Sequence, residues 1–212
     1  MNTKEKILEE AFKMFSVHGF TAVSIRDIAK AVGIKESSVY NHFESKQDIF
    51  DSIVRRQAER EIGMYKNMNL VDGGGSFSAD AQTLNMYSSL PQEQFEGMSL
   101  AIFRYYLTDE TNKRFRRMLA LEQYRSAEIG ELYRKLSFED AIEYQSRVFE
   151  GFIAAGFFKE ADPHLLALEF FSPAWLLLCQ YENRPEQVEE AQELFLQHIR
   201  RFNQMAIKGS YA

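Results

Sequence analysis

The stretch SIRDIAKAVGIKESSVYNHFESK, residues 24–46, decides the fold of the first part of this chain. It places two short helical patterns on either side of one glycine, Gly33. Ser24 with Asp27 three residues later is a typical helix start, and a glycine such as Gly33 is a typical helix end. Two short helices joined by such a turn form a helix-turn-helix unit.

The packing of this unit can be read from its apolar residues. A helix-turn-helix needs a small residue where the helices cross and an apolar residue that faces back from the second helix, and Ala29 and Val39 stand at these positions. Val39 and Phe43 are expected to point inward, because they recur at helical spacing. The outward residues of the second helix are then Ser37, Ser38, Tyr40, Asn41 and His42.

Residues 18–50, HGFTAVSIRDIAKAVGIKESSVYNHFESKQDIF, resemble the DNA-binding segment of the tetracycline-repressor (TetR) family of bacterial transcription regulators. The landmarks are the Gly-Phe pair after the first helix, SIRDIAKAVGI, VYNHF, and the SK that opens a fourth helix. The resemblance is specific over about residues 3–55 and rests on helix number and length beyond them. It implies a homodimer that places two such helices in adjacent major grooves of a double-stranded DNA operator. The single cysteine of the chain fits a reducing cytoplasm.

Hydroxyl, amide and imidazole groups suit phosphate oxygens and base edges. In TetR relatives, the positions of Tyr40 and Lys46 commonly contact phosphate, and a helix start such as Ser24 offers free N–H groups. Glu36 departs from the family pattern, and a helix-turn-helix used only for packing is the alternative interpretation. The predicted DNA-binding residues are Ser24, Arg26, Lys35, Ser37, Ser38, Tyr40, Asn41, His42 and Lys46.

The rest of the chain is predicted to be helical, with no sheet and about nine helices in all. A DNA-binding domain is expected over residues 1–60 and a larger effector-binding and dimerisation domain over residues 61–212. The glycine-rich stretch VDGGGSFSAD, residues 71–80, reads as a connection, and residues 81–90 are ambiguous. The later helices are expected at about 92–107, 111–134, 138–155, 163–181 and 186–207.

The resemblance also implies an effector pocket among the middle helices. Methionine and aromatic side chains there would suit a small, largely apolar ligand, and an inward glutamate could meet a cationic centre. A helical core without a ligand, in a DNA-bound adaptor that binds a protein partner, is the alternative. The candidate ligand residues are Met98, Phe103, Tyr106, Met118, Glu122, Tyr124, Tyr144, Phe149 and Phe152.

Two C-terminal helices are expected to form the dimer. Residues 165–179 are apolar nearly all round, and apolar residues repeat every three or four positions in the last helix. Two such helices from each chain could form a four-helix bundle across a two-fold axis. The candidate interface residues are Phe171, Trp175, Val188, Phe195, Ile199 and Phe202.

Composition and charge limit the other classes of protein. The net charge of the 212 residues is −6, but residues 1–66 contain 11 basic and 10 acidic side chains, so the acidity lies in the remainder. The single cysteine, Cys179, is expected to be buried. The N-terminus lacks a signal-peptide pattern, and no apolar stretch is long enough to span a membrane. The four histidines have no metal-ligand spacing, and no phosphate-binding or nucleophile motif occurs, so we expect no enzyme, cofactor or metal.

Overall fold

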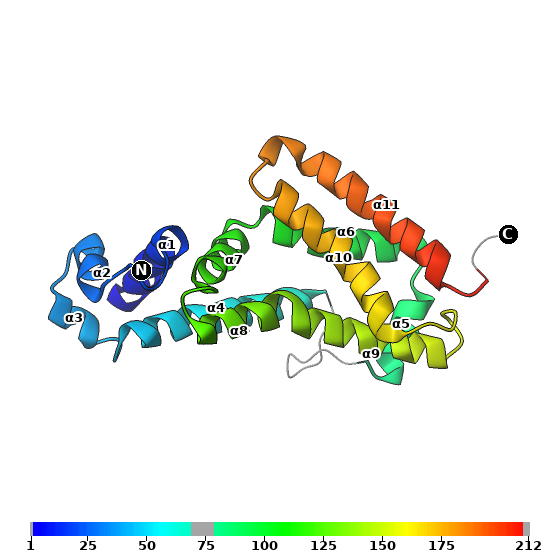
Figure 1. Ribbon diagram of the computed structural model, residues 1–212, viewed down its shortest axis with the longest axis horizontal. Coiled ribbons are helices and arrows are strands. Elements are labelled where there is room, and N and C mark those ends of the chain that lie inside the picture. Colours follow the sequence, from blue (N-terminus) through cyan, green and yellow to red (C-terminus); the bar gives the residue numbers. More distant parts are fainter. Residues whose placement is uncertain (1, 69–78, 210–212) are drawn as a thin grey trace. The chain divides into compact units, whose positions relative to one another are not determined.

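The protein is all-α, as the sequence predicts (Figure 1). A computed structural model describes residues 2–68 and 79–209, and within these ranges the only β-structure is an isolated bridge between Phe158 and Ile207. A π-helical turn, Lys135–Glu139, joins α8 to α9, and a 3₁₀ turn, Pro185–Gln187, precedes α11. The α-helices are α1 (Thr3–His18), α2 (Ile25–Val32), α3 (Glu36–Tyr40), α4 (Lys46–Asn67), α5 (Ala81–Ser89), α6 (Gln92–Thr108), α7 (Glu110–Glu122), α8 (Ala127–Arg134), α9 (Asp140–Ala154), α10 (Pro163–Tyr181) and α11 (Val188–Ala206).

The chain forms two compact units, and each contains segments from two parts of the sequence. The N-terminal unit consists of Met1–Asn67 and Glu110–Lys135, and the C-terminal unit consists of Met68–Asp109 and Leu136–Ala212. Helices α7 and α8 therefore belong to the same unit as the helix-turn-helix segment. The functional roles predicted for residues 1–60 and 61–212 stay predictions.

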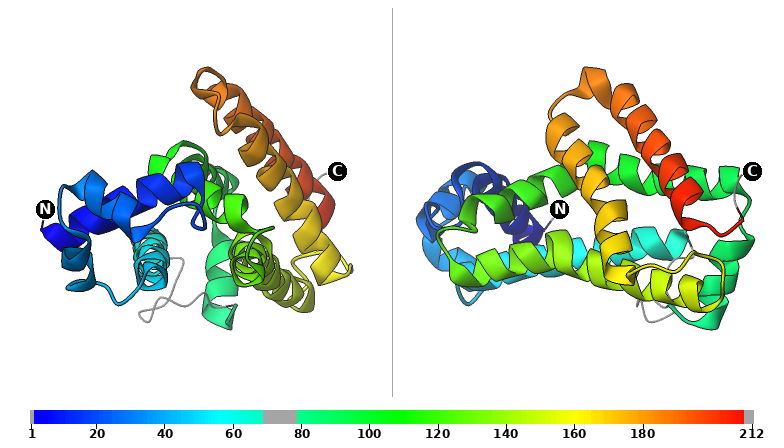
Figure 2. Two further views of the ribbon diagram at one scale, coloured as in Figure 1. Left: turned by 60° about the vertical axis from the view of Figure 1, so that its left-hand side comes forward. Right: turned by 45° about the vertical axis from the view of Figure 1, so that its right-hand side comes forward.

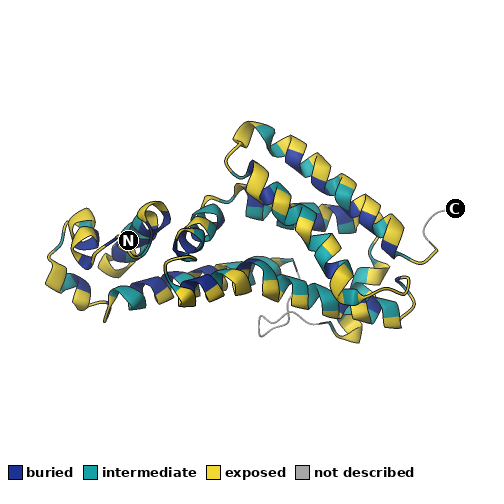
Figure 3. Cartoon of the chain, in the orientation of Figure 1, coloured by how far each residue is buried: buried dark blue, intermediate teal, exposed yellow. Residues whose placement is uncertain are grey.

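One hydrophobic core holds the N-terminal unit together. The apolar face of α7 packs on α1, because its buried residues recur at helical spacing and need a partner surface. Figure 3 shows these helices with one buried and one exposed side. The buried core side chains are Ile7, Ala11, Phe12 and Phe15 of α1, Val23 before α2, Ile25, Ile28 and Ala29 of α2, Val39 and Phe43 of the next segment, Ile49, Phe50 and Ile53 of α4, Phe115, Met118 and Leu119 of α7, and Ile129 of α8.

In the C-terminal unit, α10 packs against α9, α11 and α6, and α5 packs against α9 (Figure 2). One core of this unit surrounds Phe103 and Phe195, whose rings stack with centroids 4.3 Å apart. A second core surrounds Phe149 and Phe202. Glu96 of α6 also accepts two hydrogen bonds from the Arg200 guanidinium of α11, at 3.0 and 2.8 Å, so an ion pair joins these two helices.

The described residues contain two more helices than the nine or so expected from the sequence. The ambiguous segment forms α5, which Asp80 caps by accepting a hydrogen bond from the Thr83 N–H group. The helix expected over residues 111–134 is two helices, because Ser126 caps a new one by accepting from the Ile129 N–H group. Most of the glycine-rich stretch, residues 71–78, lies outside the described residues. Within the described ranges, no helix is long and apolar enough to cross a membrane.

Candidate nucleic-acid interface

The α2–turn–α3 segment has the helix-turn-helix geometry that the sequence predicts. Gly33 ends α2 in the left-handed conformation, with φ of 78°, and its N–H group bonds to the carbonyl oxygens of Ala29 and Lys30. Ala29 is buried where the helices approach each other, and Val39 is wholly buried. The chain can turn sharply here because glycine adopts positive φ without steric cost.

The outward side of α3 and its following turn is polar and aromatic. We call this surface the α3 face and define it as Ser37, Ser38, Tyr40, Asn41 and His42. Four of these residues are exposed and Ser38 is half-buried, whereas Val39 and Phe43 carry the inward packing. The α-helix is only five residues long, because Asn41 and His42 belong to the turn after it. The polar groups of the α3 face are thus available to a partner.

Ser24 lies at the amino end of α2 and is engaged by Asp27. Its N–H group donates to the Asp27 carboxylate at 2.9 Å, its hydroxyl donates to the same oxygen at 2.5 Å, and the Asp27 N–H group donates back to the hydroxyl. These hydrogen bonds from Ser24 lower the pKa of Asp27. The sequence suggested that the N–H groups at this helix start are free, but the Ser24 N–H group is bonded to Asp27. A contact between Ser24 and phosphate would therefore have to compete with a carboxylate. Arg26 and Lys35 are exposed.

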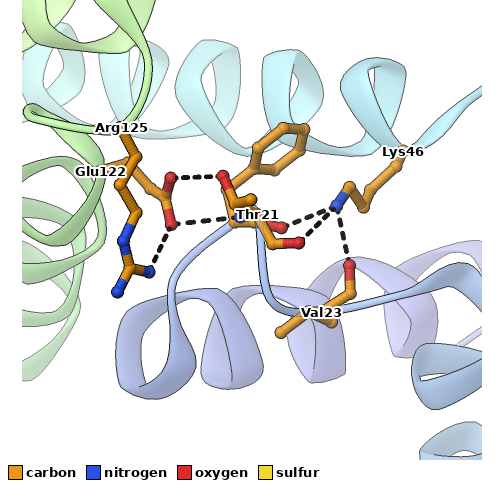
Figure 4. Close-up of polar contacts among 6 residues, drawn as sticks. Thr21, Val23, Lys46, Glu122 and Arg125 are labelled. Carbon is orange, nitrogen blue, oxygen red and sulfur yellow. Dashed lines mark hydrogen bonds and ion pairs between the residues drawn. The ribbon is translucent and has the colours of Figure 1, made fainter.

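The Lys46 ammonium, predicted to contact phosphate, lies against the α1–α2 loop, which we define as residues 19–23 (Figure 4). Its Nζ donates to the carbonyl oxygens of Phe20 at 2.7 Å and Val23 at 2.8 Å, and it lies 4.4 Å from the centre of the Phe20 ring. Burial lowers the pKa of Lys46, although the Glu122 carboxylate partly offsets that effect. Contact with phosphate would require the ammonium to leave these carbonyl oxygens, and it stays a prediction.

Glu122, predicted to line an effector pocket, lies instead in the N-terminal unit at the end of α7. Its side chain is 0% exposed, and its carboxylate accepts hydrogen bonds from the N–H and hydroxyl groups of Thr21 (Figure 4). The Arg125 guanidinium lies 3.5 Å from it. The carboxylate is thus engaged by the α1–α2 loop. The sequence signal for this role was absent, because Thr21 and Glu122 are 101 residues apart.

The nine effector candidates are divided between the two units. Glu122, Met118, which is buried in the core, and Tyr124, which is 92% exposed, belong to the N-terminal unit. The remaining six lie in the C-terminal unit, where Met98, Phe103 and Tyr106 belong to α6 and Tyr144, Phe149 and Phe152 belong to α9. The hydroxyl oxygens of Tyr144 and Tyr87 are 3.3 Å apart, and burial raises the pKa of Tyr144.

Three of the six dimer candidates are buried in the core of a single chain. The side chains that recur along α11 face α6, α9 and α10 of the same unit. They are therefore not available to a second copy of the chain, and this applies to Phe195, Ile199 and Phe202. Phe171, Trp175 and Val188 are half-buried. Cys179 is exposed rather than buried. The exposed large apolar residues of these helices are Leu165 and Leu176 on α10 and Leu194 and Met205 on α11.

Comparison with known proteins gives the same assignment for the first part of the chain. Residues 7–53 match the model of the family described as "Bacterial regulatory proteins, tetR family". The negative transcriptional regulator IcaR of the Staphylococcus aureus biofilm operon icaADBC is 42% identical over 52 residues. The transcriptional repressor KstR2 of Rhodococcus jostii is 35% identical over 65 residues. These matches span 24% and 31% of this chain and 28% and 32% of the relatives.

The fold of the whole chain resembles solved structures at lower identity. SmeT, described as the repressor of the Stenotrophomonas maltophilia multidrug efflux pump SmeDEF, has a TM-score of 0.63 and 19% identity, with 99% of this chain and 93% of that chain covered. SmeT has also been solved as a complex with triclosan. Residues 7–53 thus match the helix-turn-helix segment of bacterial regulatory proteins of the tetR family, and the whole chain shares its fold with SmeT.

Proposed function

We propose that the protein is a DNA-binding transcriptional repressor that binds its operator through the α3 face. The observation that carries the proposal is this face itself, which presents hydroxyl, amide and imidazole groups on a helix whose apolar residues are all turned inward. Such groups bind base edges and phosphates in a major groove. IcaR is a negative regulator and KstR2 a repressor, which supports repression for this chain as well.

The roles within the interface follow from exposure and charge. Arg26 and Lys35 are exposed cations on either side of the turn, so they are the best candidates for phosphate contacts. Tyr40 is 52% exposed, and its hydroxyl can donate to a phosphate oxygen. Lys46 is the candidate that the geometry favours least, because loop carbonyl oxygens occupy its ammonium.

We further propose that the regulator is a homodimer through the outward sides of α10 and α11. Leu165 and Leu176 on α10, and Leu194 and Met205 on α11, are each eleven residues apart, which is three helical turns. Each pair therefore lies along one side of its helix, and all four side chains are exposed. A two-fold axis would bury these four residues against their counterparts in a four-helix arrangement and would match a palindromic operator.

A small, largely apolar effector is proposed to release the protein from DNA. The aromatic side chains of α6 and α9 make the interior of the C-terminal unit apolar, and SmeT, which has a similar fold, has been solved with triclosan. The linkage is reciprocal, so operator DNA must weaken effector binding by the same factor. A DNA-bound adaptor that binds a protein through its C-terminal unit is the second candidate, and operator-independent effector affinity would favour it. Either protein would act in the cytoplasm.

Selection of bound sequences from random DNA, followed by titrations at several salt concentrations, tests the DNA-binding function. Arg26→Met should reduce the slope of log affinity against log salt by about 0.9, as expected for one lost phosphate contact. Asn41→Ala should instead change the preferred sequence by about 1–3 kcal/mol at one base pair and leave the slope unchanged. Lys208→Met is the charge-matched control, because Lys208 is exposed and belongs to the C-terminal unit. Failure to enrich any sequence would contradict the proposal.

A further inference from the structure

The α1–α2 loop immediately precedes the helix-turn-helix unit and is held from two sides. Lys46, at the start of α4, donates to the carbonyl oxygens of Phe20 and Val23. Glu122, at the end of α7, accepts from the N–H group of Thr21 at 3.1 Å and from its hydroxyl at 2.7 Å. Figure 4 shows the loop between these two side chains. The two opposite charges therefore bind complementary groups of one short segment.

Glu122 is an unusual residue for a contact of this kind. Burial of a carboxylate is costly unless its charge and lone pairs are satisfied. Here the two Thr21 donors and the nearby Arg125 guanidinium satisfy them, although Arg125 is itself 56% exposed. An exposed loop could be held by a neutral side chain at a lower desolvation cost. In return, a charged acceptor forms a stronger contact with the loop than a neutral acceptor does, because hydrogen bonds to ionised groups are about twice as strong as those between neutral groups.

Gly19 provides the space for the carboxylate. A Cβ atom at this position would lie 2.2 Å from the Glu122 Oε1 atom, and Gly19 has a φ of 85°. The positive φ favours glycine, and a Cβ atom here would displace the carboxylate, so Gly19 lets the carboxylate approach the loop. Gly19 belongs to the same Gly-Phe pair that marks the end of α1 in the sequence.

The loop is connected directly to the first residue of the DNA-binding unit. Val23 precedes Ser24, the residue that caps α2, and Thr21 lies only three positions before Ser24, which forms a capping box with Asp27. A shift of the loop would thus move the amino end of α2, on which the crossing to α3 depends. Loss of the Thr21 contacts would remove the carboxylate that holds this loop from the side of α7.

From this geometry we propose that Glu122 is a positioning residue for DNA binding: through Thr21 it fixes the α1–α2 loop and thereby the amino end of α2. This inference rests on the proposed DNA-binding function and assigns that function a residue of α7, remote in sequence from the helix-turn-helix. Glu122 does not touch DNA in this proposal. It orders the α1–α2 loop before binding, so that the cost of ordering is not subtracted from the affinity.

The test compares four variants in operator titrations under conditions in which each is folded. Glu122→Ala should weaken operator binding by about tenfold, as expected for the loss of about two hydrogen bonds, and Thr21→Val by about threefold. The double variant should bind like Glu122→Ala alone, because both changes remove the same contact. Glu122→Gln, which retains an acceptor for the Thr21 N–H group, should recover part of the loss. Glu131→Ala is the control, because it removes one exposed negative charge from the neighbouring helix α8.

The sign of the effect separates positioning from simple electrostatics. Removal of a negative charge favours binding to phosphates, so an electrostatic effect alone would raise the affinity of Glu122→Ala. Unchanged or increased affinity for Glu122→Ala, or additive losses in the double variant, would overturn the proposal.

A second measurement does not depend on DNA. Hydrogen exchange of the Thr21 amide in the free protein should be about tenfold faster in Glu122→Ala, while that of Ile28 in α2 should not change. An unchanged Thr21 exchange rate would overturn the positioning role even if no operator were found. Normal binding by the unmodified protein with no effect of Glu122→Ala would overturn only this inference, whereas absence of any operator would overturn the proposed function.

Discussion

Replacement of Lys46 by methionine is expected to destabilise the free protein by about 2 kcal/mol. The ammonium donates to two carbonyl oxygens, at 2.7 and 2.8 Å, and hydrogen bonds to charged groups contribute about 1.5–3 kcal/mol each. Lys46 is only half-buried, so water can replace part of what is lost, and the sum must be reduced for solvent screening. Methionine keeps an apolar stem beside the Phe20 ring, which isolates the loss of the ammonium group.

Urea denaturation followed by circular dichroism measures this effect at equilibrium. In a separate thermal denaturation, a loss of about 2 kcal/mol would lower the melting temperature by about 4–8 °C for a protein of this size. Lys6→Met removes an exposed ammonium and should change the free energy of unfolding by less than about 0.5 kcal/mol. Equal stability of the two variants would refute the reasoning, because it would mean that the Phe20 and Val23 carbonyl oxygens do not hold the Lys46 ammonium in solution.

Three further predictions concern other parts of the fold. The hydrogen bonds from Arg200 lower the pKa of Glu96 below its ordinary value of 4.5. The stability that this pair contributes is therefore present above that pH and is lost as the pH falls through the folded-state pKa. In urea denaturation, Glu96→Gln should be less stable than the unmodified protein near neutral pH, and the difference should shrink in acid. Gly33→Ala should cost about 1–2 kcal/mol in the same assay, because a Cβ there meets no atom within 4 Å and only the positive φ opposes it. Val39→Ala should cost about 2 kcal/mol, because it removes two methyl groups from a wholly buried position, and a loss below about 0.5 kcal/mol for either substitution would contradict these assignments.

The sequence predicted the helix-turn-helix correctly because its signals are local. Gly33 is needed for a left-handed helix end, and the capping pair Ser24 and Asp27 lies within one helical turn. The inward direction of Val39 and Phe43 follows from helical spacing alone. Each of these features depends on residues a few positions apart, so a single sequence contains the information.

The sequence could not predict which surface covers each apolar stripe. The repeat in α11 does mark a packing side, but Phe195 and Ile199 pack inside their own unit rather than against a second copy. Periodicity identifies a buried side and does not identify its partner. In the same way, the sequence offered Glu122 as an inward residue but not its partner, because Thr21 becomes a neighbour only when α7 packs on α1.

Helix α7 makes a polar contact with three separate elements of the N-terminal unit. Arg114 pairs with Glu9 of α1 at 3.1 Å, Asn112 accepts a hydrogen bond from Gln57 of α4, and Glu122 binds the α1–α2 loop. Hydrogen bonds weaken steeply as their geometry is lost, so α7 cannot shift by more than a fraction of an ångström without moving these elements or breaking the contacts. Any process that displaces α7 would therefore change the free energy of the DNA-binding arrangement, and DNA binding would by linkage oppose that displacement to the same extent. The Thr21–Glu122 contact is where this coupling can be measured most directly, because it can be removed at either end without altering the α3 face.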